Sequence, residues 1–135
     1  MSTESRISLS LVLLRVGVFI VMLVWTLDKF INPAHTIAVY ANFYYLGDLA
    51  PAIIYTIAAV ELVIIVGFVL GMFKTFTYGA VLLLHAMSTL VAYKQYFSPY
   101  EDANILFFAA WPMLAACAAL FLLRDLDKWW VLQKA

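Results

Sequence analysis

Charged residues and cysteines are scarce in this chain. Only 12% of its 135 residues are charged and the formal net charge is zero, so neither a basic nucleic-acid-binding surface nor a nucleic-acid partner is indicated. The single cysteine, Cys117, excludes an internal disulfide and a C-x-x-C redox pair. Glycine-rich phosphate loops, H-E-x-x-H and Ser/His/Asp arrangements are also absent from the sequence. The sequence therefore contains no recognised catalytic motif of its own.

Apolar residues, in contrast, dominate the sequence. They make up 67% of it and the mean hydropathy is +1.00, whereas a soluble domain has roughly 45–50% apolar residues. Four apolar runs of the length that crosses a bilayer, about 20 residues each, cover residues 7–27, 52–72, 76–96 and 103–123. The first run is predicted to be an uncleaved span, because Arg15 interrupts it and no small-x-small cleavage site follows. The sequence predicts one all-α domain over residues 1–135, an integral membrane four-helix bundle.

The longest link, between the first two spans, contains a helix-start signal. Asn32-Pro33 is typical of an N-cap followed by proline at the first helical position. A short interfacial helix is predicted over residues 33–46, with Gly47 ending it and several tyrosines at headgroup level. His35 is interpreted as a solvated surface residue of this helix. More Lys and Arg residues flank the ends on the side of the termini, which predicts cytoplasmic termini.

Three spans each place an ionisable residue at a similar predicted depth. At a rise of ~1.5 Å per residue, Arg15, Glu61 and His85 lie roughly 12, 16 and 13 Å from the same membrane face. Because a lone charge in lipid is costly, we expect Arg15 to pair with Glu61 and His85 to lie nearby. Ser88 and Thr89 share the helical face of His85 and are secondary candidates. This buried polar layer either fixes helix register or handles a proton or substrate.

Several other features have simpler interpretations. Pro112 is expected to kink the fourth span near its middle. Gly67-x-x-x-Gly71 predicts close packing of the second span on a neighbour. Asp125 and Asp127 are interpreted as part of a solvated helical face of little energetic value.

Two further features concern the tail and metal binding. Trp129 and Trp130 are expected to anchor the chain at the membrane interface after the fourth span. His85, Cys117 and the methionines are scattered along the sequence, so no metal site is predicted.

The polar residues of the first two spans resemble a family pattern. The matching segments are Arg15-x-Gly17, Asp28-Lys29-Phe30, and Glu61 followed by Gly67 and Gly71. They are similar to the DoxX-like family of small four-span bacterial membrane proteins, over most of the chain. The resemblance implies a multi-pass protein of the bacterial inner membrane. It also adds Lys29 to the candidate site, since the family usually has a lysine at the end of its first span.

Two functions follow as hypotheses. DoxX-like proteins include a small subunit of an archaeal thiosulfate:quinone oxidoreductase and a membrane component of a complex for redox homeostasis. The first hypothesis is therefore an accessory or anchoring subunit of a quinone-linked redox complex, at most a non-catalytic subunit of an oxidoreductase. Its expected partner is another redox subunit or a second copy of the chain, and its candidate cofactor is a quinone. The second is a stand-alone transporter of a proton or small solute, with Arg15, Glu61 and His85 as its polar midpoint.

Overall fold

The computed structural model describes residues 1–133, and within that range the chain is helical and contains no strand. Its elements in order are α1 (Thr3–Ile31), α2 (Pro33–Phe43), α3 (Pro51–Val69), α4 (Lys74–Val91), α5 (Tyr93–Phe97), η1 (Asn104–Ala109), α6 (Ala110–Leu122) and η2 (Arg124–Leu126). Three helical stretches in the described range are long and apolar enough to cross a membrane: α1, α3 and the continuous run from η1 through α6.

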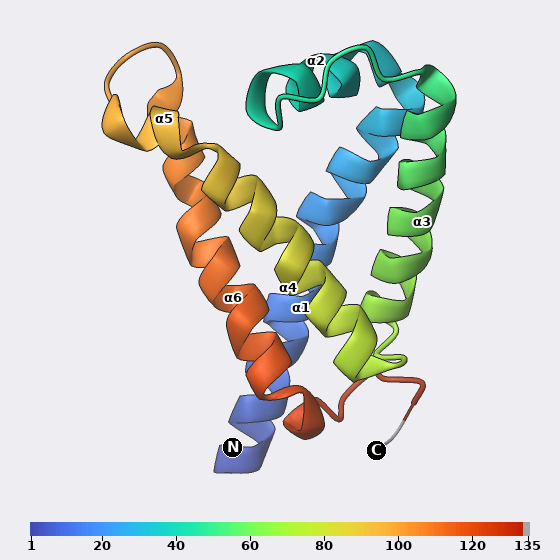
Figure 1. The fold of residues 1–135 in the computed structure, drawn as a ribbon. Helices are drawn as coiled ribbons and strands as arrows, with labels where there is room; N and C mark the ends of the chain where they lie inside the picture. Colours follow the sequence, from blue (N-terminus) through green and yellow to red (C-terminus); the bar gives the residue numbers. More distant parts are fainter. Residues whose placement is uncertain (134–135) are drawn as a thin grey trace.

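The long helices pack as two pairs. Helix α1 packs mainly against α3, and α4 packs mainly against α6. The pairs are joined where α3 packs on α4 and where α1 meets α6. In Figure 1 they converge near the end where the N-terminus lies and diverge toward α2 and α5. We call the converging end the lower end and the other the upper end, as they are drawn in Figure 1.

The connection between α3 and α4 is a tight turn, as the short link predicts. Gly71 (φ +64°) and Phe73 (φ +46°) both have left-handed backbone conformations, which reverse the chain direction within four residues. A Cβ added at Gly67 would lie 3.1 Å from Thr77 Cγ2, so this glycine lets α3 and α4 approach closely. The predicted close packing is therefore confirmed at Gly67. Gly71, however, belongs to the turn and not to a helix face.

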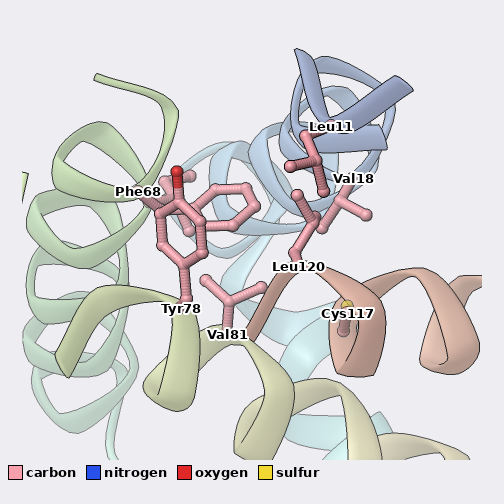
Figure 2. Close-up of a cluster of buried hydrophobic side chains, with 8 residues drawn as sticks. Leu11, Val18, Phe68, Tyr78, Val81, Cys117 and Leu120 are labelled. Carbon is pink, nitrogen blue, oxygen red and sulfur yellow. The ribbon is translucent and has the colours of Figure 1, made fainter. Parts of the chain in front are cut away.

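A compact apolar core lies where the two pairs converge. Figure 2 shows part of it, with Leu11 and Val18 from α1, Phe68 from α3 and Leu120 from α6. Tyr78 of α4 packs edge-on against Phe68, with ring centroids 5.0 Å apart, and its hydroxyl points out of the apolar cluster in Figure 2. This core fixes the lower halves of the four long helices relative to one another.

The exterior of the protein is more apolar than parts of its interior. Each long helix exposes a large aliphatic side chain: Leu13 is 64% exposed, Val63 74%, Leu83 62% and Leu122 72%. The buried residues include many polar ones, namely Ser8, Arg15, Thr26, Thr36, Thr77, His85, Thr89 and Asp127. Contiguous exposed apolar surface on this scale marks an interface with lipid or protein, and lipid fits helices of this length and hydropathy. The fold is therefore that of a membrane protein.

The helix boundaries differ from the sequence-based expectation in three places. The helix after Pro33 ends at Phe43 and not near Leu46, because Tyr45 has a left-handed conformation (φ +57°) that a helix cannot continue. The third apolar run divides into α4 and α5 around Ala92. Pro112 lies in the first turn of α6, after a 3-10 segment. Because the first-turn N–H groups have no helical partner, proline is tolerated there. The predicted kink at Pro112 therefore lies close to the change from 3-10 to α-helix, and it stays a prediction.

Candidate functional site

Arg15 lies in a closed polar cluster at the lower end. Its Nη1 donates to Asp127 Oδ2 at 2.7 Å and to the Tyr78 hydroxyl at 3.3 Å. The Tyr78 hydroxyl donates to the same carboxylate oxygen at 2.7 Å. Side-chain exposure is 1% for Arg15 and 0% for Asp127. The pair is sealed from its surroundings, and removal of one charge would leave the other buried and unpaired.

The same guanidinium holds the C-terminal segment in place. Arg15 Nη2 donates to the carbonyls of Trp129 at 2.8 Å and Trp130 at 2.9 Å. The Lys74 ammonium group donates to the Asp127 carbonyl from the start of α4. Residues 124–133, which we call the C-terminal strap, therefore run across the lower end of the helices instead of extending α6.

The expected pair between Arg15 and Glu61 is wrong. Thr26, which donates to Glu61 Oε2 at 3.2 Å, lies 11 residues after Arg15 on α1, about 16 Å along the axis at ~1.5 Å per residue. The predicted depths of Arg15, Glu61 and His85 assumed that all spans start at the same height on the side of the termini. In the structure α1 begins well below the α3–α4 turn, because the Tyr78 hydroxyl near the start of α4 already reaches Arg15.

Glu61 pairs with Lys29 instead. Lys29 Nζ lies 3.0 Å from Glu61 Oε2, and each side chain is 12% exposed. Lysines near the ends of membrane helices usually extend outward to the headgroups, whereas Lys29 turns inward toward a carboxylate at mid-helix. Since this pair, unlike that of Arg15, keeps some accessible surface, Lys29 and Glu61 are the better candidates for contact with a ligand.

Helix α2 covers the Lys29–Glu61 pair from the upper end. It packs on both α1 and α3. Burial raises the pKa of the Tyr40 and Tyr44 hydroxyls, and the nearby Glu61 carboxylate raises both further. The upper site thus combines an ammonium, a carboxylate, the Thr26 hydroxyl and two tyrosines at the junction of three helices. Together these groups can both donate and accept hydrogen bonds.

A contact between α1 and α2 closes one side of the upper site. His35 Nδ1 lies 2.5 Å from Asp28 Oδ2, and the His35 ring stacks on Trp25 at 6.1 Å. His35 is about half exposed, so the interpretation of this residue as a surface histidine is confirmed. Its role in the structure is to attach the first turn of α2 to the last turns of α1.

His85 belongs to neither charged pair. Its Nε2 lies 2.9 Å from the Ala110 carbonyl and 3.3 Å from Thr89 Oγ1. The hydroxyls of Ser88 and Thr89 donate to the His85 backbone carbonyl at 3.0 and 2.7 Å. The contact with Ala110 connects α4 to the start of α6, and the other three lie within α4, as expected for a hydrogen-bonded core histidine. The three members of the predicted polar layer therefore lie in three separate environments.

Asp127 is the residue that sequence reasoning misjudged most. It was interpreted as a solvated residue near Lys128, yet it is fully buried. The local sequence around Asp127 resembles that around Asp125, which is exposed, so no local signal separates the two. The only available indication was that a buried arginine needs an acidic partner, and Glu61 was an equally good candidate on that ground.

Comparison with known proteins gives no match: no family model, no curated protein and no solved structure is similar to this chain. Within residues 1–133, no group of three or more His, Cys, Asp or Glu side chains is placed to hold a metal ion.

Proposed function

We propose that this chain is a four-span protein of the bacterial inner membrane, an accessory or anchoring subunit of a quinone-linked redox complex. The observation that carries the proposal is the separation of its charges into two local pairs, Arg15 with Asp127 and Lys29 with Glu61. The first pair ties α1 to the C-terminal strap and the second ties α1 to α3, as expected of a scaffold.

The path of the chain supports a fourth span. Helix α4 starts at the α3–α4 turn at the lower end, and η1, which continues into α6, starts near α5 at the upper end (Figure 1). If α3 and α6 cross the membrane, α4 crosses it as well, because it connects their opposite ends. Its polar residues Thr77, His85 and Thr89 are buried against protein, which lets a less apolar helix remain in lipid.

The redox part of the proposal rests on the likeness of Arg15, Lys29 and Glu61 to the DoxX-like pattern. A quinone carbonyl needs hydrogen-bond donors, and the Lys29 ammonium and the Tyr40 and Tyr44 hydroxyls supply them near the upper end. A quinone head between these groups would be held by donors from α1 and α2, while its isoprenoid tail lies in lipid.

Purification from the native host in mild detergent tests the proposal. With an affinity tag at the N-terminus, we expect a redox protein and a quinone to co-purify. Lys29→Met should lower the quinone content several-fold and leave the partner bound, because it removes a donor in the upper site. Lys94→Met is the matched control, since Lys94 is also at the upper end but exposed. Recovery of a lone homo-oligomer without quinone would overturn the proposal.

The transporter hypothesis remains the second candidate, favoured by one observation: the Lys29–Glu61 pair is partly accessible at mid-helix depth. It predicts that Glu61→Gln abolishes proton or solute uptake in proteoliposomes while the protein still folds. The sealed environment of Arg15 supports the scaffold proposal over a continuous polar route through all three expected residues.

A further inference from the structure

The strap is held by backbone groups as well as by the buried side chain of Asp127. Besides the two carbonyls bound by Arg15, the Leu132 N–H donates to the Leu70 carbonyl at 2.8 Å. Gln133 Oε1 accepts from the Phe73 N–H at 2.5 Å. As a consequence Trp130 is 81% exposed and Leu132 69% exposed. Asp127 and several backbone groups of the strap therefore face protein, whereas the side chains of Trp130 and Leu132 face outward.

Two aromatic residues at this end have backbone conformations that bulky side chains rarely adopt. Trp130 (φ +51°) and Phe73 (φ +46°) are both left-handed, and Phe73 is 64% exposed. A bulky residue with positive φ is an outlier, and such outliers cluster at functional sites. Here the unusual conformation presents two large rings to the surroundings at the ends of the spans, where aromatic rings favour the headgroup region.

The charge of the molecule is strongly polarised between its ends. The lower end carries Arg6, Lys74, Arg124 and Lys128 against Glu4 and Asp125, a balance of +2. The upper end carries Lys29 and Lys94 against Asp28, Asp48, Glu61, Glu101 and Asp102, a balance of −3. The opposite charges of Arg15 and Asp127 cancel and are not counted. The exposed rings of the strap therefore lie on the positive end, which attracts anions.

A groove lies beside the strap at the same end. It has a volume of about 310 Å³ and lies between the first turns of α1 and η2. Ile7 and Leu126 give it apolar walls. Lys128, 60% exposed, stands at its rim and forms an exposed ion pair with Glu4 at 3.7 Å, a contact of little energetic value. An apolar wall below a cation matches a phospholipid, whose acyl chain and charged headgroup need these two environments in that order.

We propose that the strap and the first two turns of α1 form a binding site for an anionic phospholipid. The headgroup phosphate lies at Lys128 and replaces its exposed contact with Glu4, and the acyl chain lies along Ile7 and Leu126. The rings of Trp129 and Trp130 lie at the interface. Arg15 positions this site by holding the strap carbonyls. The inference rests on the membrane-spanning part of the proposed function and is independent of its redox part.

Native mass spectrometry of the full-length protein in detergent tests the site directly. Titration with phosphatidylglycerol should give adducts at several-fold lower concentration than titration with phosphatidylcholine. A lysine near an anionic surface contributes about 1 kcal/mol, a factor of roughly five, so Lys128→Gln should weaken the phosphatidylglycerol adduct about fivefold. Lys94→Gln, at the negative end, is the matched control and should have no effect.

Three results would overturn the inference. The first is that phosphatidylglycerol and phosphatidylcholine form adducts at the same concentration. The second is that Lys128→Gln and Lys94→Gln weaken the phosphatidylglycerol adduct equally. The third is that a host protein binds the strap and is not displaced by phosphatidylglycerol. Carbonate extraction of the same membranes separates this outcome from failure of the proposed function. If a variant stays in the membrane pellet but no longer prefers phosphatidylglycerol, only the lipid site is affected. If the wild-type protein appears in the supernatant, the chain does not span the membrane and the proposed function fails.

Discussion

The buried pair of Arg15 and Asp127 is the most consequential contact between two residues in the described chain. It joins α1 to a segment 112 positions later, so its loss would free the strap as well as leave a charge unpaired. Burial is incompletely compensated, since Arg15 Nε and Asp127 Oδ1 have no hydrogen-bond partner among the described residues. The pair therefore fixes how the helices assemble more than it adds net stability.

Asp127→Asn should destabilise the fold by about 3–5 kcal/mol, because the guanidinium of Arg15 stays buried without a counter-charge. Asp125→Asn, two residues away and exposed, should change stability by no more than about 0.5 kcal/mol. Reversible unfolding in mixed micelles measures both. Equal effects of the two substitutions would show that Asp127 is not the partner of Arg15.

Lys29 and Glu61 form the second pair, and its partial exposure makes it weaker. Lys29→Met or Glu61→Gln alone should cost about 1–3 kcal/mol, between the values for exposed and buried pairs. The double variant should cost less than the sum of the two, and the difference measures their coupling. By contrast, Arg15→Gln with Glu61→Gln should be additive, because these residues lie in separate clusters. Strict additivity for Lys29 and Glu61 would contradict the pairing.

At the scale of elements, two connections decide how the helices are placed: the α3–α4 turn and the attachment of α2. The turn needs a residue without a Cβ at Gly71, where an added Cβ would lie 2.4 Å from Val131 Cγ1. The attachment of α2 depends on the Asp28–His35 contact and on the half-buried tyrosines near Glu61. One connection therefore determines the position of the strap and the other that of the cover over the upper site.

Gly71→Ala should destabilise the protein by at least about 1–2 kcal/mol, the cost of a left-handed conformation, and should displace the strap. Gly17→Ala is the matched control, since an added Cβ there meets no atom within 4 Å. Within α1 it should stabilise by up to about 1 kcal/mol, because alanine is the better helix former. Thermal unfolding of both variants in one detergent makes the comparison. A neutral Gly71→Ala would contradict the described packing of Val131.

Alkaline pH should loosen α2. The pKa of Tyr40 and Tyr44 is raised above the ordinary value of 10.0 by burial and then by Glu61. Above that value the unfolded chain has lost protons that the folded chain still holds, so their stabilising contribution is complete below pH 10 and declines as the pH rises through the folded values. Unfolding measured from pH 8 to 11.5 should show this decline. Tyr40→Phe with Tyr44→Phe should flatten it, and Tyr100→Phe, an exposed control, should not.

At the scale of the whole molecule, the distribution of charge and the arrangement of the helices are consistent with one orientation in the membrane. The positive end carries both the strap and the start of α1, and the negative end carries α2 and α5 (Figure 1). Positive ends of membrane proteins stay in the cytoplasm, so the proposed topology places the strap inside the cell and the upper site outside. The proposed lipid site and the proposed quinone site then face opposite leaflets.

Cysteine labelling tests this topology in a Cys117→Ala background. Asp125→Cys at the lower end should react with a membrane-impermeant maleimide only in inverted membrane vesicles. Tyr100→Cys, which replaces a residue 90% exposed at the upper end, should react only in intact spheroplasts. Labelling of both positions from one side would mean that the chain between them does not cross the membrane.

The sequence by itself determined the features that depend on local chemistry. Long apolar runs require helices in lipid, so the helical class and the apolar character of α1, α3 and α6 were predictable. Pro33 started α2 as expected, and His35 stayed at the surface. These predictions succeeded because hydropathy and proline geometry act over a few residues.

The tertiary structure alone decided the pairing of the buried charges. A buried arginine requires an anion, but its identity depends on the relative heights of the helices, and α1 extends farther below the α3–α4 turn than equal span lengths imply. That offset brings Asp127 to Arg15 and Lys29 to Glu61. Contacts between distant segments accompany this offset: the strap is bonded both to Arg15 of α1 and to Leu70 and Phe73 at the α3–α4 turn. No local pattern encodes contacts of this kind.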